Sequence, residues 1–418
     1  MIGRRHVFHI GGYDPIVPER QFERFRRSLS SFERTWNVSS QTSAITDMSK
    51  VSACWDVEAW GPNWKTRMTF EMLRWDDLIL RDSQRGMWSR LGQSWYSLFD
   101  FVVTGAWFRY VYANWRYAAF FIFPYLYVAL FGLAGAAIAY AVIRLSGLTG
   151  VYAAISGVLI TAAIFLGLVH WLGPRRRINH VLDDAIFSRQ FLYGERPEME
   201  RRIDDFASRI VERARKADVD EILIVGHSLG AALTMAAVAR ALKQDPQLAK
   251  HGPTLCVLTV GATIPKFSLH PKGDRIRQAT QIVADELSIQ WTEYQARDDA
   301  ISFYRFDPLT LKRVSRDHPD GRPNIRRVQI HSMMDPASFK RHRFHYMRMH
   351  YQFLMGNGRR APYDYCMIIC GPLDFDDITA PLGGVDRFQA DGSVIDGLTA
   401  LKSTAAQLEP RRGGASGV

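Results

Sequence analysis

Two long uncharged stretches place the strongest constraint on how this chain can fold. The first runs from Ala118 to Ile143 (26 residues) and the second from Leu148 to Leu172 (25 residues). Each exceeds the roughly 20 residues that a helix needs to cross a bilayer. The linker Arg144-Leu145-Ser146-Gly147 is short enough for a helical hairpin. We predict a transmembrane hairpin over residues 118–172; the alternative is two long helices buried in a soluble core, where uncharged runs of this length are rare.

Basic residues flank the predicted hairpin unequally. Arg109 and Arg116 precede it and three arginines at 175–177 follow it, whereas the turn between the segments offers only Arg144. Because positive residues remain on the cytoplasmic side, we expect an integral membrane protein with two transmembrane helices and with both termini and the flanking domain in the cytoplasm.

The composition limits the classes of binding partner that we expect for this chain. The 418 residues are 47% hydrophobic and carry a net charge of +11. We find no zinc-finger spacing, RNA-binding aromatic motif or long basic tract, so we expect no nucleic-acid partner, and the arginines beside apolar segments favour a membrane. The four cysteines are spaced poorly for a metal site or a disulfide framework, which predicts free thiols in a reducing compartment. The N-terminal apolar run is too short for a signal peptide.

A short motif directly follows an apolar run. Gly226-His227-Ser228-Leu229-Gly230 comes after Glu221-Ile222-Leu223-Ile224-Val225 and precedes a run rich in alanine and leucine, Leu229 to Leu242. A buried strand that ends in G-x-S-x-G and enters a helix is typical of a nucleophile elbow. The serine then occupies a sharp, strained turn, and glycines flank it because larger side chains would collide there. The alternative is a tight turn with a buried serine.

Strands and helices alternate along much of the chain. We predict strands near residues 7–10, 51–60, 66–75, 254–260, 289–295 and 324–330, and helices over 19–36, 86–115, 178–193, 198–216 and 275–287, with a helical segment after the last strand that ends near Met355. This order predicts an α/β fold with a mostly parallel sheet and helices on both faces. We divide the chain into an N-terminal part of the catalytic domain (1–117), the hairpin (118–172), the catalytic part (173–356) and an irregular C-terminal tail (357–418), whose last residues, 408–418, we expect to be disordered.

With these features the chain resembles the α/β-hydrolase superfamily in its lipase and esterase branch. The resemblance covers residues 178–355 well and residues 7–13 loosely, and the inserted hairpin departs from the usual soluble pattern. It implies an α/β-hydrolase fold and a serine–histidine–acid triad in the chain order Ser, Asp, His. Ser228 would be the nucleophile. Neither a metal nor an organic cofactor is implied.

The resemblance also indicates the triad partners. Family members often carry an aspartate followed by any residue and then Ile or Val, which selects Asp299 in Arg297-Asp298-Asp299-Ala300-Ile301, with Asp298 as the runner-up. A histidine followed three residues later by an aromatic residue selects His350. The other candidates after the last strand are His331, His342 and His345.

Two backbone N–H groups should form the oxyanion hole. One belongs to Leu229, the residue after the nucleophile. The other would come from Gly11-Gly12-Tyr13, which resembles the glycine-rich loop of the family; we select Gly12, with Tyr13 as the alternative, and a plain glycine turn remains open.

These observations predict a membrane-anchored serine hydrolase (an esterase or lipase-like enzyme) that cleaves carboxylic ester or thioester bonds, with an acyl lipid as the natural substrate. The alternatives are a non-catalytic membrane scaffold or binding protein that retains the hydrolase fold, and a thioesterase or acyltransferase on the same fold. The loop from Arg305 to Pro323 is either a lid or a plain surface excursion.

Overall fold

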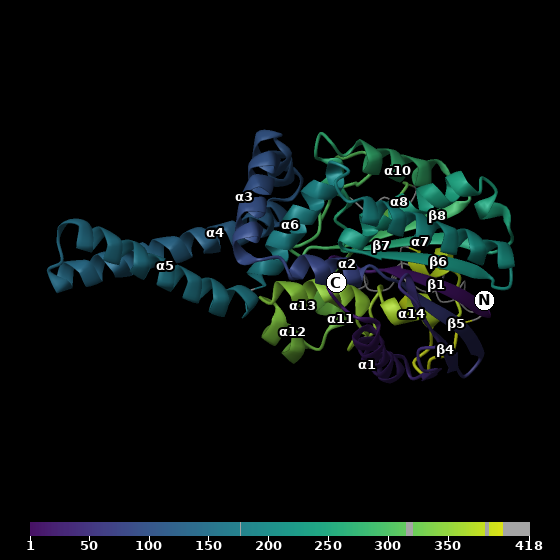
Figure 1. Ribbon diagram of the computed structural model, residues 1–418. Coiled ribbons are helices and arrows are strands. Elements are labelled where there is room, and N and C mark those ends of the chain that lie inside the picture. The colour runs from purple at the N-terminus through teal and green to yellow at the C-terminus, as the bar shows by residue number, and fades with distance from the viewer. Residues whose placement is uncertain (176, 315–320, 381–383, 396–418) are drawn as a thin grey trace, which may run out of the picture.

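A computed structural model describes residues 1–175, 177–314, 321–380 and 384–395. A central mixed sheet carries helices on both faces, and a long helical hairpin projects from one end of this body (Figure 1). The strands are β1 (Arg4–Ile10), β2 (Ser39–Thr42), β3 (Asp47–Met48), β4 (Ser52–Gly61), β5 (Trp64–Leu73), β6 (Glu221–His227), β7 (Thr254–Val260), β8 (Ile289–Ala296) and β9 (Asn324–Val328).

The strand order in the sheet is β2-β4-β5-β1-β6-β7-β8-β9, and β3 pairs with β4. The pairs from β5 through β1 to β9 are all parallel, whereas β2, β3 and β5 pair antiparallel with β4. The prediction of a mixed α/β fold with a mostly parallel sheet is confirmed. The antiparallel edge arises because β4 and β5 are joined by a tight hairpin, whereas the parallel strands are joined by longer connections, most of them helical.

Helices cover the sheet in two groups. One face packs against α2 (Asp76–Ser83), α6 (Ile178–Leu192), α7 (Pro197–Lys216), α8 (Leu229–Gln244), α9 (Ile264–Ser268) and α10 (Asp274–Asp285), and α3 (Met87–Val103) joins them at the hairpin end. The other face packs against α1 (Pro18–Trp36), α11 (Ile330–Met333), α13 (Tyr346–Tyr351), α14 (Tyr365–Cys370) and α15 (Phe375–Thr379); α12 (Pro336–His342) lies on the same side. Short 3₁₀ turns are η1 (Leu248–Lys250), η2 (Gln352–Leu354) and η3 (Gly384–Arg387).

Side chains of the central strands alternate between two hydrophobic cores, one on each face of the sheet. In β6, Ile222 and Ile224 enter one core while Leu223 and Val225 enter the other. Successive side chains of a strand point to opposite faces, so a strand covered on both sides reads as a continuous apolar run.

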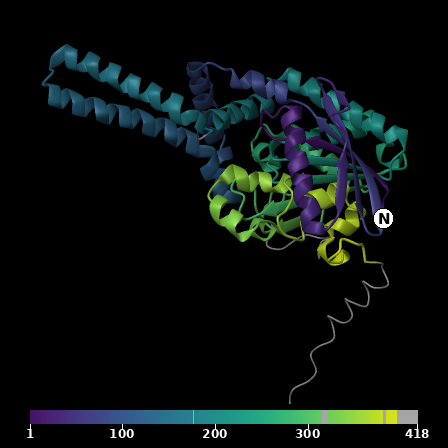
Figure 2. The ribbon, with the colours of Figure 1, turned by 90° about the horizontal axis from the view of Figure 1, so that it is seen from below.

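The hairpin consists of α4 (Ala106–Ser146) and α5 (Gly150–Arg175), which pack side by side and stand away from the body (Figures 1 and 2). Both helices are long and apolar enough to cross a membrane. Leu133 and Val158 are 66% and 70% exposed, and none of the most apolar stretch of α5 is buried. This exposure is the opposite of what two helices in a soluble core would show.

Two local features shape α4. At Asn114 the backbone leaves the helical conformation (φ −155°, ψ 103°), and the Asn114 amide donates a 2.8 Å hydrogen bond to the carbonyl of Ser302 in the body. Further along, Gly135 lies against α5, where a Cβ atom would stand 2.8 Å from the carbonyl oxygen of Thr161. The small residue therefore allows close contact between the two helices.

The expectation of an irregular tail from residue 357 is wrong for its first part. Helices α14 and α15 lie here, and residues Tyr365 to Cys370 are all buried. Arg5 fixes the segment, because its guanidinium donates to the carbonyls of Ile368 (2.6 Å) and Leu373 (2.8 Å) as well as to Glu221 (2.6 Å). Helices of five or six residues produce too little periodicity to be recognised.

Some expectations lie partly or wholly outside the described residues. The proposed disorder of residues 408–418 does so entirely, and the loop from Arg305 to Pro323 does so at 315–320. The helix expected to end near Met355 is instead a succession of short helices, α11 to α13, followed by η2.

Candidate active site

Ser228 occupies a strained turn between β6 and α8. Its φ of 57° and ψ of −126° lie outside the regions that residues with a Cβ atom ordinarily adopt. Helix α8 starts at the next residue, Leu229, so the N-terminal end of the helix dipole points toward the turn.

The glycines on either side of Ser228 are required by close packing. A Cβ atom at Gly226 would stand 2.6 Å from Cα of Ala231, and a Cβ atom at Gly230 would collide with the carbonyl oxygens of Ile10 and Gly11. Gly230 thus lets the first turn of α8 lie directly against the loop after β1.

His350 and Asp299 form a buried pair. Nδ1 of His350 lies 2.8 Å from Oδ2 of Asp299, and their side chains are 3% and 0% exposed. The second carboxylate oxygen of Asp299 accepts a 2.9 Å hydrogen bond from the N–H of Ile301. Both oxygens are therefore held, and the carboxylate fixes the imidazole orientation.

The other acid and histidine candidates from the sequence take no part in the His350–Asp299 pair. Asp298 is partly exposed; it neighbours the pair in sequence but does not bond to His350. His331 is exposed and packs against Phe339, His342 bonds to the carbonyl of Ser338, and His345 caps α13 through the N–H of Arg348.

Ser228 and His350 line one cavity of about 40 Å³, which has room for a few water molecules. Nε2 of His350 is buried, and no atom of the described residues is hydrogen-bonded to it. The Ser228 side chain and the His350 ring thus line the same cavity, and no hydrogen bond joins them. In enzymes whose serine and histidine act together, the two side chains are often farther apart before substrate binds than afterwards.

The loops that form the site follow neighbouring strands. Gly12 follows β1, Ser228 follows β6, Gly261 follows β7 and Asp299 follows β8. The carboxyl ends of parallel strands meet at one edge of the sheet, which is where α/β folds place their ligands. His350 reaches this edge from α13, which follows β9 in the chain, and lies beside His227 and Gly261.

Three backbone N–H groups stand free beside Ser228. Within the described part of the chain, no acceptor bonds to the N–H of Gly12, Tyr13 or Leu229. Gly12 lies close to Ser228, since a Cβ atom there would stand 2.8 Å from Cβ of Ser228. These groups are suitable donors to an oxyanion, and the structure brings both residues selected from the sequence, Gly12 and Leu229, to the serine.

Two contacts of the pair have no signal in the sequence. A Cβ atom at Gly261, whose φ is 53°, would stand 3.0 Å from Cε1 of His350 and 3.2 Å from Oδ2 of Asp299. The ring of His227, the variable residue of G-x-S-x-G, lies 4.5 Å from that of His350. Burial lowers the pKa of His227 well below its ordinary value, so the ring remains uncharged beside His350.

An ion pair between a buried lysine and a partly exposed aspartate forms another part of the cavity wall. Nζ of Lys266 lies 2.6 Å from Oδ2 of Asp184, and Lys266 is only 2% exposed. Burial lowers the pKa of Lys266, and it also lowers the pKa of His180, which lines the same wall. Nothing in the sequence around these residues marks them, because they come from α6 and α9, which approach the cavity only in the folded chain.

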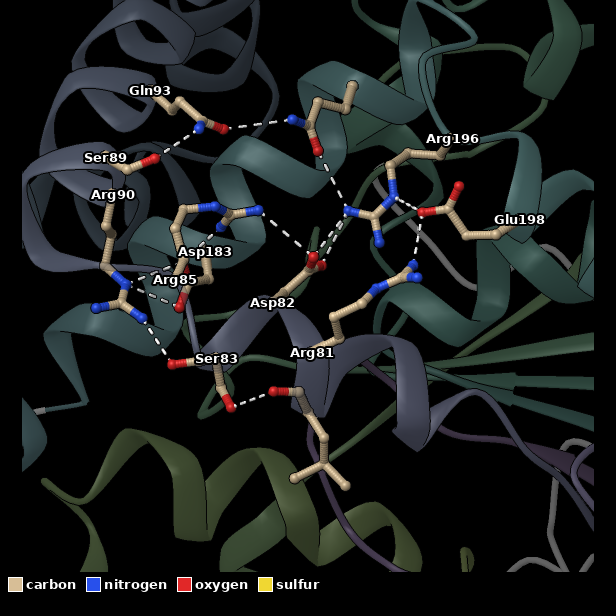
Figure 3. Close-up of polar contacts among 12 residues, drawn as sticks. Arg81, Asp82, Ser83, Arg85, Ser89, Arg90, Gln93, Asp183, Arg196 and Glu198 are labelled. Atoms are coloured by element: carbon tan, nitrogen blue, oxygen red, sulfur yellow. Dashed lines mark hydrogen bonds and ion pairs between the residues drawn. The ribbon is translucent and has the colours of Figure 1, made fainter.

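The loop after β1 is held by a network of charges. The hydroxyl of Tyr13 donates a hydrogen bond to the carboxylate of Asp82 (3.0 Å), which also accepts a hydrogen bond from the guanidinium of Arg196 (2.9 Å). Figure 3 shows how the network continues to Asp183 on α6, which binds Arg90 of α3 at 3.0 Å. Burial is the main cause of the raised pKa of Tyr13, which therefore stays protonated and able to donate.

Among the described residues, no group of three or more His, Cys, Asp or Glu side chains is arranged to hold a metal ion. No protein-family model, curated protein or solved structure matches this chain, so the geometry above is the ground on which function is inferred.

Proposed function

We propose that this protein is a serine hydrolase of the α/β-hydrolase type that cleaves carboxylic ester or thioester bonds. One observation carries the proposal: Ser228, on a strained strand-to-helix turn, shares a cavity with His350, whose Nδ1 is held by buried Asp299 and whose Nε2 is unpartnered. A strained serine alone would be weak support, and the buried Asp–His pair beside it is what favours catalysis.

The roles follow from the geometry. Ser228 attacks the carbonyl carbon of the substrate while His350 accepts the hydroxyl proton at Nε2. The resulting imidazolium keeps its Nδ1–H on Asp299. The N–H groups of Leu229 and Gly12 receive the developing oxyanion, and the alcohol or thiol leaves with the proton from His350. Water then attacks the acyl-enzyme by the same route.

An acyl lipid is the substrate class that the surroundings favour. The cavity wall includes Tyr117 and Phe120 of α4, the helix that continues directly into the exposed apolar hairpin. If the hairpin spans a bilayer, the cavity lies immediately beside the lipid headgroups.

The proposed anchorage fixes a topology. The loop after β1 precedes the hairpin and Ser228 follows it, and both contribute to one cavity, so the number of crossings between them is even. With the arginines at the base of the hairpin, both termini should be cytoplasmic. Reporters fused to each end test this, and reporters on opposite sides would overturn the anchorage.

Labelling with a fluorophosphonate probe tests the activity. We expect detergent-solubilised wild type to be labelled and Ser228→Ala and His350→Ala to lose labelling, while Ser332→Ala and His331→Ala, which alter residues outside the cavity, retain it. Well-folded wild type that resists labelling and hydrolyses no short-chain ester would overturn the proposal and favour a non-catalytic scaffold.

A further inference from the structure

Helix α3 presents an apolar stripe to solvent. Trp88, Trp95, Tyr96, Phe99 and Val103 are between 43% and 68% exposed. Residues 88, 95, 99 and 103 follow one another at intervals of seven, four and four, and Tyr96 lies beside them, so all five occupy one face. The opposite face is held to the body by Arg90, Leu98 and Phe101. A helix with such a face, in a chain that also carries an exposed apolar hairpin, is typical of an element that lies in a membrane interface.

A second exposed segment lies across the hairpin from α3. Lys340, Arg341 and Arg343 are all exposed, and Phe344 is 85% exposed with the Arg343 guanidinium 4.7 Å from its ring. Within the described part of the chain, none of the three basic side chains takes part in a salt bridge. Free positive charge beside a fully presented aromatic ring is complementary to anionic lipid headgroups above an apolar layer.

Both elements meet the hairpin at the same level. On one side Trp95 of α3 packs against Tyr125 of α4, with ring centroids 5.4 Å apart. On the other side Tyr346, two residues after Phe344, packs against Phe120 and Phe123 of α4 at 5.6 and 5.8 Å. Both views show α3 and the α12–α13 region on opposite sides of the hairpin base (Figures 1 and 2).

The hairpin beyond this level has the length of a bilayer core. The 21 residues from 126 to 146 rise about 31 Å as a helix, close to the ~30 Å hydrocarbon thickness. The contact of Gly135 with Thr161 places residue 126 opposite residue 170 on α5. Next to it, Trp171 is 57% exposed with the Arg175 guanidinium 4.8 Å from its ring, an arrangement common where helices enter the headgroup layer.

We propose that the α3 stripe and residues 340–346 form an interfacial collar, which rests in the headgroup layer of an anionic bilayer around the base of the hairpin. This inference rests on the proposed membrane anchorage and goes beyond it by naming the lipid surface. The aromatic side chains enter the boundary between headgroups and acyl chains, and Lys340, Arg341 and Arg343 bind lipid phosphates. Each basic side chain contributes a factor of about five in local membrane affinity.

The collar would also deliver substrate. Residues 340–346 lead directly into α13, whose Met347, His350 and Tyr351 line the cavity, and Phe120 of α4 lines it as well. Phe120 precedes residue 126 by six positions, so the cavity lies beside the collar on the side of the body, about one to two helical turns outside the segment that would span the hydrocarbon core.

A fluorescent reporter at position 344 tests the collar without depending on activity. The four native cysteines are buried, so Phe344→Cys offers a selective site for the environment-sensitive NBD label. The full chain is reconstituted in nanodiscs of phosphatidylcholine, with or without phosphatidylglycerol, that contain doxyl-labelled quencher lipid. Leu133→Cys on the hairpin reports membrane insertion. Leu287→Cys is the matched negative control, because Leu287 is 74% exposed and precedes β8 at the amino ends of the parallel strands, opposite the edge that carries the cavity.

We expect the emission of the label at 344 to be blue-shifted and quenched in anionic nanodiscs, and less so in neutral ones. In the triple variant Lys340→Gln/Arg341→Gln/Arg343→Gln, the emission should be the same in anionic and neutral nanodiscs. Quenching at 133 together with an unshifted label at 344 in both lipids would overturn the collar and leave the anchorage intact. Equal quenching at 344 in both lipids would overturn the anionic preference. No quenching at 133 would overturn the anchorage and the collar together, and none of these outcomes bears on the hydrolase proposal.

Discussion

Nδ1 of His350 lies 2.8 Å from Oδ2 of Asp299, although 51 residues separate them in the chain and they come from different elements. The contact is fully enclosed by protein. A charge-assisted hydrogen bond is stronger in such surroundings than in water, so the pair holds one imidazole orientation.

Replacing Asp299 by Asn should turn an NH2 donor toward Nδ1 of His350, because the amide oxygen keeps the hydrogen bond from the N–H of Ile301, and so favour the wrong tautomer of the imidazole. We expect kcat for a soluble ester to fall by about 10³- to 10⁴-fold, while KM changes little. The control is Asp298→Asn, which alters a partly exposed neighbour and should retain wild-type kcat. Equal losses in the two variants would contradict the assignment of the acid.

Gly261→Ala should separate packing against the pair from backbone strain. The new Cβ atom would stand 3.0 Å from Cε1 of His350, so we expect kcat to fall by more than an order of magnitude. Gly194→Ala imposes a similar positive φ with nothing within 4 Å. Both variants should lose about 1–2 kcal/mol of stability, measured by thermal unfolding in detergent, but only the first should lose activity.

Buried His9 should make stability depend on pH. Burial lowers the pKa of His9 to about 4, whereas the unfolded chain has the ordinary value of 6.5. Between pH 6.5 and 4, His9 is protonated in the unfolded state but neutral in the folded state. The free energy of unfolding is therefore highest above pH 6.5 and falls by about 3 kcal/mol as the pH drops toward 4. His9→Gln should flatten this part of the stability profile. The same change at exposed His331 should leave the profile as it is.

Arg5→Met should destabilise the domain without touching the cavity. The Arg5 guanidinium binds buried Glu221 at 2.6 Å, and its removal leaves that carboxylate enclosed without its counter-charge. We expect a loss of about 3–5 kcal/mol in the free energy of unfolding, measured by denaturant titration in detergent. Arg4→Met, one residue away and exposed, is the control and should cost less than about 0.5 kcal/mol.

Gly135→Leu should disturb the packing of the hairpin. A side chain at Gly135 meets the backbone of Thr161, whereas one at Gly132 meets nothing within 4 Å. We expect a lower thermal midpoint for Gly135→Leu, corresponding to about 1–3 kcal/mol, and a midpoint near wild type for Gly132→Leu. Similar midpoints for both variants would show that the two helices do not depend on this contact.

Local patterns in the sequence determined the elements that are long or strongly apolar. The uncharged runs predicted α4 and α5, and the run before Gly226 predicted β6, because length and continuous hydrophobicity alone specify such segments. The helices α14 and α15 escaped recognition because each has fewer than two turns, and their burial depends on Arg5, some 360 residues earlier in the chain.

The candidate site divides in the same way. The sequence by itself indicated Ser228, because its turn chemistry is local, and the family pattern narrowed the partners to Asp299 or Asp298 and to four histidines. Tertiary structure decided the rest: the pairing of Asp299 with His350, the close approach of Gly261, and the ion pair of Lys266 with Asp184 all join segments that come together only when parallel strands align their carboxyl ends. Such contacts leave no trace in local sequence, since each depends on the position of a residue tens of positions away.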